Sequence, residues 1–270
     1  MSRGESGALM LVKLGGSVIT DKSKPFTERM DAIERLAKEI HSARASSGLR
    51  LIVGHGGGSY PHTPAEKFQI SRGLIGEESS RGVALVQDAA ARLNRLVVNA
   101  LIDAGEDAVS VQPSACILAE SSRIVHWDTQ VLQKMLKIDL LPVVYGDVVM
   151  DVKQGCSIAS TEEIFFYLAN LLPVHRVLIG SDVDGVLDYT SRSREKIDII
   201  TPSDKTSISA SLQGAETVDV TGGMKSKVEL LLKLAEEKGV ESEILNASRP
   251  GLLEYALKGR RGQGTIIRPD

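Results

Sequence analysis

The chain has 270 residues, 42% hydrophobic and 25% charged, which is typical of a globular protein and excludes disordered and collagen-like chains. Its net charge of −3 and its aromatic content of 4% provide neither a basic field for nucleic acid nor stacking side chains for single-stranded bases. No segment has the roughly 18 uninterrupted apolar residues that span a membrane, and the first ten residues lack a secretion signal, so we expect a cytoplasmic protein that does not bind membranes.

Strands and helices alternate along the first half of the sequence. Three short apolar runs predict buried strands at residues 8–14, 51–53 and 108–111. Apolar residues at helical spacing predict a helix that begins after Thr27, its expected N-cap, and another helix over about 81–104. This half therefore has the order strand, helix, strand, helix, strand.

The alternation continues through the second half. Further strands are predicted at residues 141–144, 148–150, 176–179, 242–245 and 265–267, and helices over about 161–171 and 223–238. Strands separated by helices favour a mostly parallel sheet covered on both faces, which is a three-layer αβα sandwich of the α/β class. Residues 186–218 are irregular and rich in Ser, Asp and Lys, and they form either a mobile flap or a plain surface excursion.

Glycine-rich segments lie where predicted strands end or a helix begins. They are Gly15-Gly16-Ser17, Gly56-Gly57-Gly58 and Gly222-Gly223. Glycine lets backbone N–H groups approach an anion closely, and a helix N-terminus adds partial positive charge. Ligands collect at the carboxyl ends of parallel strands, so the three segments together favour phosphate binding over ordinary turns. None fits the dinucleotide-binding or P-loop consensus.

Lysines accompany these segments. Lys13 ends an apolar strand, where a charge must be buried or paired. Lys22 follows the first glycine pair, and Lys225 and Lys227 lie in the first turn of the late helix. A cation there opposes the helix dipole unless an anion lies nearby, so this placement also favours phosphate binding. A solvated surface position remains the alternative for Lys225.

Acidic residues and two histidines complete the candidate site. The acidic residues at strand ends and helix starts are Asp147, Glu162, Glu163, Asp182, Asp184 and Asp219. They either hold lysines in position or bind Mg²⁺ through water, and helix capping is an equal alternative for Glu162 and Glu163. His55 and His62 flank the triple glycine on what we expect to be irregular backbone. Their spacing predicts no metal site, and we expect both to donate hydrogen bonds to an anion.

Several motifs resemble the amino acid kinase superfamily and occur in its order. They are KLGGSVITDK at 13–22, HGGGSYPH at 55–62, VQPSA at 111–115, PVVYGDVV at 142–149, DVDGV at 182–186 and DVTGGMKSK at 219–227. Within the superfamily they most resemble the isopentenyl phosphate kinases. The resemblance implies one domain of the amino acid kinase fold over 1–270, with an acceptor-binding part at about 1–175 and a nucleotide-binding part at about 176–270. It also implies a homodimer.

The resemblance further implies that ATP phosphorylates isopentenyl phosphate, with Mg²⁺ as cofactor, to give isopentenyl diphosphate for isoprenoid biosynthesis. Such a transfer brings many negative charges together, so catalysis should consist of positioning and electrostatic neutralisation. The acceptor is a phosphate monoester, which is mostly dianionic at neutral pH, and its oxygen can attack without a general base.

The matching motif positions imply roles for single residues. Lys13 would contact the transferring group, Lys22 and Lys227 the nucleotide phosphates or the transition state, and His62 the acceptor phosphate, while Glu162 would orient the lysines. Substrate-binding positions would be Gly15, Gly16, Ser17, Gly56, Gly57, Gly58, Gly146 and Asp147. Nucleotide-binding positions would be Lys13, Gly15, Asp182, Asp184, Gly185, Gly222, Gly223 and Lys227. Val83 and Val86 are candidates for an apolar pocket around the isopentenyl tail, with plain core packing as the alternative.

The sequence departs from the family pattern at two places, and two other functions are compatible with it. Pro61 stands where the histidine loop GSFGH has glycine, and Glu162-Glu163 stand where many relatives have two aspartates. A kinase for another small phosphate or phosphonate is one alternative, because fosfomycin kinases have a similar histidine loop. A non-catalytic oxyanion-binding protein of the same fold, like the molybdenum storage proteins, is the other.

Overall fold

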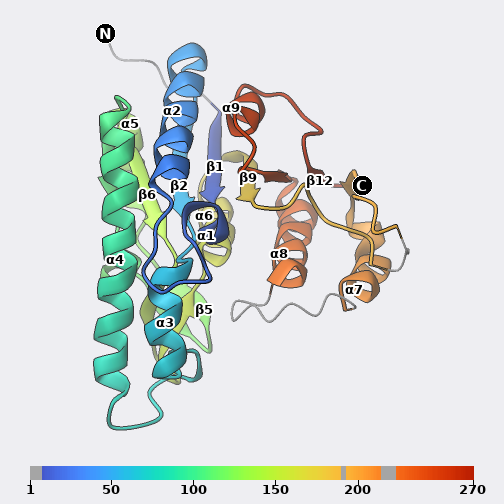
Figure 1. The fold of residues 1–270 in the computed structure, drawn as a ribbon. Coiled ribbons are helices and arrows are strands. Elements are labelled where there is room, and N and C mark those ends of the chain that lie inside the picture. Colours follow the sequence, from blue (N-terminus) through green and yellow to red (C-terminus); the bar gives the residue numbers. More distant parts are fainter. Residues whose placement is uncertain (1–7, 190–192, 214–222) are drawn as a thin grey trace.

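The computed structural model describes residues 8–189, 193–213 and 223–270. An eight-stranded sheet with helices against both faces forms its centre (Figure 1). The strands lie in the order β10-β12-β11-β9-β1-β2-β6-β3. Their bounds are Leu9–Leu14 (β1), Arg50–His55 (β2), Ala108–Ser110 (β3), Leu141–Tyr145 (β6), Val174–Ser181 (β9), Ile199–Ile200 (β10), Glu241–Asn246 (β11) and Thr265–Ile267 (β12). Every neighbouring pair is parallel except β11–β12, so the predicted mostly parallel sheet is confirmed.

Helices connect most of the strands. Their bounds are Gly16–Ile19 (α1), Met30–Ser47 (α2), Ser59–Lys67 (α3), Ser79–Asp103 (α4), Gln130–Lys137 (α5), Thr161–Leu171 (α6), Lys205–Gln213 (α7), Gly223–Lys238 (α8) and Leu252–Leu257 (α9). The predicted helices correspond to α2, α4, α6 and α8. The predicted N-cap of α2 is wrong, because Arg29 occupies that position and the Thr27 hydroxyl donates to the Pro25 carbonyl at 3.0 Å. Local turn chemistry before the helix takes up the threonine side chain.

The two faces of the sheet bury separate hydrophobic cores. In β1, Leu9 and Leu11 pack into one core, while Met10, Val12 and Leu14 pack into the other. Successive side chains of a strand point to opposite faces, so an uninterrupted apolar run supplies both cores. Helices α6 and α8 cover the first core, and α2, α4 and α9 cover the second. This arrangement confirms the three-layer architecture.

A smaller sheet lies outside the main one. It has four strands in the order β5-β4-β7-β8, with bounds Leu118–Glu120 (β4), Arg123–His126 (β5), Asp147–Asp151 (β7) and Gly155–Ala159 (β8). The strand predicted at 148–150 therefore belongs to this smaller sheet and not to the main sheet. Strands β4, β5 and β8 were not predicted, because they are short and their mixed polar sequences show no clear apolar run.

The described part of the irregular segment 186–218 contains β10, a 3₁₀ turn at Pro202–Asp204 and helix α7. Residues 190–192 and 214–222 lie outside the described residues. The sequence of α7, KTSISASLQ, is rich in Ser and Thr, which are weak helix formers, so its pattern did not indicate a helix. Ile208 and Leu212 anchor α7 because both are buried in the core beside α8.

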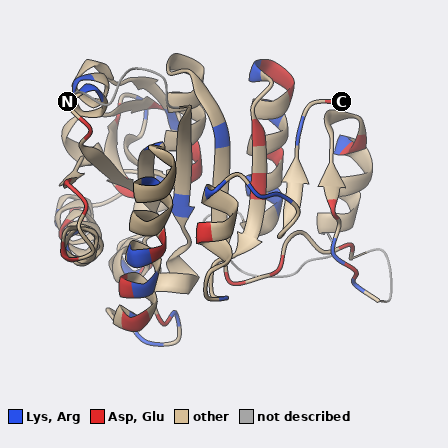
Figure 2. Ribbon diagram, turned by 90° about the horizontal axis from the view of Figure 1, so that it is seen from above, with Lys and Arg blue, Asp and Glu red and all other residues tan. Residues whose placement is uncertain are grey.

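Charged residues mark the outer layers of the fold. Figure 2 shows Lys and Arg interspersed with Asp and Glu along the helices, whereas the strands carry few of either sign. Among the described residues, no helix combines the length and the apolar character that crossing a membrane requires.

Four central strands end in one row of the main sheet. In the register of the sheet, Leu14 at the end of β1 pairs with His55 of β2 on one side and with Gly180 of β9 on the other. His55 in turn pairs with Tyr145 at the end of β6. The loops that follow these strands therefore leave from a single edge, which is where ligands bind in open parallel sheets.

Candidate active site

A cavity of about 750 Å³ opens at this edge of the sheet. Its walls include the loops after β1, β2 and β6, the end of β9, and the first turns of α3, α6 and α8. The residues of the sequence-based site that line it are Lys13, Gly15, Gly16, Ser17, Lys22, Gly56, Gly57, Gly58, His62, Val86, Gly146, Asp147, Glu162, Glu163 and Lys227. The cavity thus brings together both halves of the sequence.

Other residues of that set do not line the cavity. Val83 packs, partly buried, against the small hydrophobic cluster that contains Val86. Asp184 accepts hydrogen bonds from Asn246 and Arg249, both at 2.8 Å, and so ties together the loops after β9 and β11. The remaining described positions outside the cavity wall are Asp182, Gly185, Gly223, Lys225 and His55. Gly222 and Asp219 lie outside the described residues.

The two glycine loops touch each other through their backbones. A Cβ on Gly16 would lie 2.5 Å from the nitrogen of Gly58, and one on Gly56 would lie 2.8 Å from the nitrogen of Gly16. Gly58 also has a φ of +54°, a conformation that favours glycine. The floor of the cavity is therefore built from peptide groups without intervening side chains.

Pro61 fits the histidine loop without distortion. It is the third residue of α3, where a backbone N–H has no partner within the helix, so the missing donor of proline removes no helical hydrogen bond. Its ring lies against Gly57 and fills the space that a Cβ on Gly57 would occupy. The departure from the family pattern thus has a local compensation in the same loop.

Lys13 and Glu162 form a buried ion pair in the cavity wall. Lys13 Nζ lies 2.5 Å from Glu162 Oε1, and the two side chains are 8% and 9% exposed. Burial would raise the pKa of Glu162, but the positive charges of Lys13 and Lys227 outweigh it and hold that pKa below its ordinary value. Glu162 is therefore a carboxylate that joins β1 to α6 beside the charge of α8.

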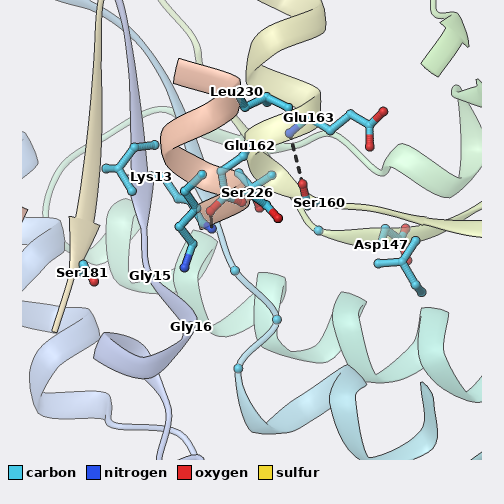
Figure 3. A pocket seen from close by; sticks show the side chains of 18 of the residues that line it. Lys13, Gly15, Gly16, Asp147, Ser160, Glu162, Glu163, Ser181, Ser226 and Leu230 are labelled. Atoms are coloured by element: carbon cyan, nitrogen blue, oxygen red, sulfur yellow. Dashed lines mark hydrogen bonds and ion pairs between the residues drawn. The ribbon is translucent and has the colours of Figure 1, made fainter. Parts of the chain in front are cut away.

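Glu163 lies in a different environment from Glu162. Its side chain points away from Lys13 (Figure 3), and its backbone N–H donates to the hydroxyl of Ser160, the N-cap of α6, at 3.1 Å. Burial raises the pKa of Glu163, and the charge of Arg123 only partly offsets this. Because Ser160 supplies the cap, neither glutamate caps the helix through its side chain, and Glu162 is the one that reaches Lys13.

The two histidines differ in their placement. His62 lies on α3, not on irregular backbone, and lines the cavity half-buried. His55 ends β2, is 1% exposed and does not line the cavity. The expectation that His55 donates a hydrogen bond to an anion is therefore wrong, because both of its ring nitrogens contact other groups of the protein.

Asp147 is the second buried carboxyl group of the wall. It accepts hydrogen bonds from the backbone N–H groups of Ser114, at 3.1 Å, and Val148, at 2.8 Å. Burial nevertheless raises the pKa of Asp147 to about 6, and the hydrogen bonds from Ser114 and Val148 reduce this shift only in part.

One end of the cavity is apolar. Ala65 of α3, Val86 of α4 and Ile158 of β8 line it on the side of His62. Val86 is 1% exposed and belongs with Ile70 to a small core that joins these elements. The cavity therefore combines a cationic, glycine-lined part with an apolar recess.

Sequence reasoning missed several cavity residues. Ser122 and Arg123 come from the β4–β5 turn, which Asp151 holds by accepting the N–H groups of Ser121 at 3.1 Å and Ser122 at 2.7 Å. Lys205 comes from the unpredicted helix α7. No sequence motif surrounds Ser122, Arg123 or Lys205. The one signal that the sequence offered was a turn that precedes Asp151 in the chain.

The chain is similar to known kinases over most of its length. The model of the amino acid kinase family matches residues 8–246. Isopentenyl phosphate kinase of Methanothermobacter thermautotrophicus is 42% identical over 272 aligned positions, which cover 96% of this chain and 98% of that protein. The isopentenyl phosphate kinase of Methanocaldococcus jannaschii is 36% identical, over 83% of this chain and 87% of that protein. A solved structure of an isopentenyl phosphate kinase matches with a TM-score of 0.80 and 37% identity, over 96% of this chain and 100% of the other.

Proposed function

The chain belongs to the amino acid kinase family, and we propose that it transfers the γ-phosphoryl group of ATP to isopentenyl phosphate, forming isopentenyl diphosphate and ADP for isoprenoid biosynthesis. The observation that carries the choice of acceptor is the composition of the cavity, in which a cationic, glycine-lined part adjoins an apolar recess. Isopentenyl phosphate has the same two parts, a phosphate group and a hydrocarbon tail.

The lysines of the cavity neutralise the reacting phosphates. In the reaction, the bond from the γ-phosphorus to the ADP oxygen breaks and a bond to an acceptor phosphate oxygen forms. Lys13 contacts the transferring group, while Lys22 and Lys227 contact the nucleotide phosphates or the transition state. Fixed cations in a closed site stabilise the spreading negative charge without reorganising.

The acceptor phosphate lies against His62 and the loop Gly56–Gly58. The N–H groups of Gly57 and Gly58 and the His62 side chain donate hydrogen bonds to phosphate oxygens, whereas the N–H of Gly56 donates to the carbonyl of Leu14 at 2.9 Å. Gly15, Gly16 and Ser17 face the same space from the β1 loop, and Gly146 and Asp147 close it from the β6 side. The dianion attacks without a general base because it is already deprotonated at neutral pH.

Glu162 acts through Lys13. The 2.5 Å ion pair holds the Lys13 ammonium group beside the two glycine loops. It therefore restricts the conformations that the Lys13 side chain can adopt. The pairing also compensates for removing two charges from water. Glu162 is thus a positioning residue for the lysine that contacts the transferring group.

Mg²⁺ would be carried on the phosphates of ATP, where it would offset their negative charge. Among the described residues, no group of three or more His, Cys, Asp or Glu side chains is arranged to hold a metal ion. Mg²⁺ keeps several waters and is usually bound by substrate phosphates with one or two carboxylates, so this chemistry suits an ion carried by the nucleotide.

The tail of the acceptor fills the recess lined by Ala65, Val86 and Ile158. Transfer of this five-carbon chain from water into the recess favours binding, by roughly 0.8 kcal/mol per buried methylene group. Val83 lies behind this wall and supports it.

The nucleotide occupies the opposite side, towards the C-terminal part of the chain. The positions assigned to it are Asp182, Asp184, Gly185, Gly222 and Gly223, in addition to Gly15, Lys13 and Lys227. The two-part domain with its boundary near 175, the homodimer and the cytoplasmic location belong to the same proposal.

A coupled assay of ADP release tests the function. The panel consists of isopentenyl phosphate, dimethylallyl phosphate, fosfomycin, UMP and N-acetylglutamate. We expect turnover with isopentenyl phosphate. An absence of turnover with the first two compounds would overturn the proposal, and turnover with fosfomycin alone would favour a phosphonate kinase. A third outcome is that the protein binds ATP but that Lys13→Ala and His62→Ala change the result of no assay. This outcome would favour an oxyanion-binding protein.

A further inference from the structure

His55 is part of a buried chain of polar contacts behind the cavity. Its Nδ1 lies 3.1 Å from the carbonyl oxygen of Gly56, and its Nε2 lies 3.1 Å from Asn94 Nδ2 on α4. Ser110 at the end of β3 donates to Asn94 Oδ1 at 2.5 Å. The ring also stacks on Tyr145, with 5.5 Å between centroids and 10° between planes. Of these residues only Gly56 lines the cavity, whereas His55, Asn94, Ser110 and Tyr145 do not.

These contacts are consistent with one proton arrangement. The carbonyl of Gly56 only accepts, so Nδ1 of His55 must carry a proton. Burial lowers the pKa of His55 to about 4, although the hydrogen bond to Gly56 opposes the shift, so the ring is neutral at neutral pH and Nε2 is an acceptor. Asn94 then donates to Nε2 and accepts from Ser110. Each of these contacts thus joins a donor to an acceptor, and the chain ends on the Gly56 carbonyl.

Anchoring this carbonyl sets the direction of the next N–H group. The carbonyl of Gly56 and the N–H of Gly57 belong to one trans peptide unit, so they point in opposite directions. His55 lies on the buried side, whereas Gly57 lines the cavity. Among the described residues, no group accepts a hydrogen bond from the N–H of Gly57. This N–H is therefore turned towards the cavity as a donor for a ligand.

The backbone of His55 ties the same place to two other walls. Its carbonyl oxygen accepts the N–H of Gly146 at 3.2 Å and the hydroxyl of Thr161 at 2.6 Å. Thr161 directly precedes Glu162 on α6. These bonds do not use the side chain, so they persist when the side chain alone is replaced.

We propose that the His55 side chain, held by Asn94 and Ser110, is a positioning residue that turns the Gly57 N–H towards the acceptor phosphate. The identity of that acceptor rests on the proposed function. The contrasting possibility is a buried polar side chain that only stabilises the fold. The two differ in what a substitution changes: a purely structural role alters stability without selecting one substrate.

The test compares His55→Asn with His55→Leu. Both side chains are shorter than histidine and similar to each other in shape, and both lose the contact with Asn94. Only the asparagine amide places a donor where Nδ1 now lies. We expect His55→Leu to raise the KM for isopentenyl phosphate by about tenfold to hundredfold, the range for a lost hydrogen bond to a charged group. The KM for ATP should stay within about threefold, and His55→Asn should recover most of the acceptor affinity. Equal acceptor KM values for the two variants would overturn the proposal.

A second measurement needs no turnover. In ¹⁵N-labelled wild-type protein, the histidine spectrum should show the Nδ1–H tautomer for His55, and inorganic phosphate should shift the Gly57 amide resonance. His55→Leu should abolish or strongly reduce that shift. If the wild-type amide of Gly57 does not respond to phosphate, the proposal is wrong. This readout stands even if isopentenyl phosphate proves not to be the substrate, so the two hypotheses fail separately.

Discussion

Lys13 and Glu162 pair at 2.5 Å although both side chains are nine-tenths buried, and they come from β1 and α6, elements far apart in the sequence. Removing two charges from water is unfavourable unless they compensate each other closely. The pair therefore fixes the relative positions of the first glycine loop and the N-terminus of α6. The removal of either partner leaves a buried charge in the cavity wall without its nearest countercharge.

Replacing Glu162 with glutamine should impair the chemical step. Glutamine keeps the shape but not the charge, so the ammonium group of Lys13 loses the partner that directs it. We expect kcat to fall by about tenfold to hundredfold, with smaller changes in both KM values. Steady-state kinetics of Glu162→Gln and Glu163→Gln provide the comparison, because Glu163 points away from Lys13. A larger loss of kcat in Glu163→Gln than in Glu162→Gln would show that Glu162 is not the carboxylate that positions Lys13.

Replacing His62 with alanine should affect the acceptor selectively. His62 lines the cavity, and in the proposed function its loss removes one hydrogen bond to the dianionic acceptor phosphate. The expected increase in the KM for isopentenyl phosphate is about tenfold to hundredfold, with a much smaller change for ATP. Initial-rate measurements with each substrate varied in turn give both constants. Similar increases for the two substrates would contradict the assigned role.

The two valines of α4 should separate tail binding from core packing. Val86 lines the recess, whereas Val83 lies behind it. We expect Val86→Asn to raise the KM for isopentenyl phosphate by about tenfold, because a polar group then faces the hydrocarbon tail. Both substitutions should lower the free energy of unfolding, because Val86 is 1% exposed and Val83 is partly buried, but Val83→Asn should leave this KM within about threefold. Steady-state kinetics and urea unfolding of both variants check this prediction. If Val83→Asn raised the KM as much as Val86→Asn, the recess would not be the binding site of the tail.

Asp147 should make the stability of the protein depend on pH. Its pKa is about 6 in the fold against an ordinary value of 3.8, so the folded state binds the proton more tightly than the unfolded state. Well below pH 3.8 the carboxyl is protonated in both states and the fold is not penalised. As the pH rises through about 6, the folded state must accommodate a buried carboxylate, and stability decreases.

The variant Asp147→Asn isolates this contribution. Its free energy of unfolding relative to wild type should increase between pH 4.5 and pH 7.5, by at most about 3 kcal/mol, from roughly 1.4 kcal/mol for each pKa unit. Urea titrations of both proteins at the two pH values measure the difference. A difference that stays constant, or that falls with increasing pH, would show that burial does not raise the pKa of this group.

Much of the fold was predictable because local pattern and tertiary position agree. The run from Leu9 to Leu14 is apolar at every position except Lys13, as a strand buried on both faces requires. Lys13 was for the same reason recognisable as a charge in need of a partner. The glycines at 16, 56 and 58 were expected near phosphate, and the structure shows a further reason for them, the close contact between their backbones.

Other features depend on contacts that no local pattern reveals. The α7 segment is helical because Ile208 and Leu212 pack against the core, although its Ser and Thr residues favour other conformations. His55 was expected to face an anion because it adjoins the glycine loop, but Asn94, which lies 39 positions further along the chain, draws its ring to the other side. Only a folded chain shows which side of a loop a side chain occupies.

The meeting of Gly16 with Gly58 limits how this protein can change during evolution. A side chain introduced on Gly16 or Gly58 would clash with the backbone of the other loop, so a single substitution there disturbs both glycine loops at once. New acceptors are accessible instead through Ala65, Val86 and Ile158, whose replacement reshapes the recess and leaves the phosphoryl-transfer machinery intact. Enzymes of this architecture can therefore diversify in what they phosphorylate while the chemistry itself is inherited unchanged.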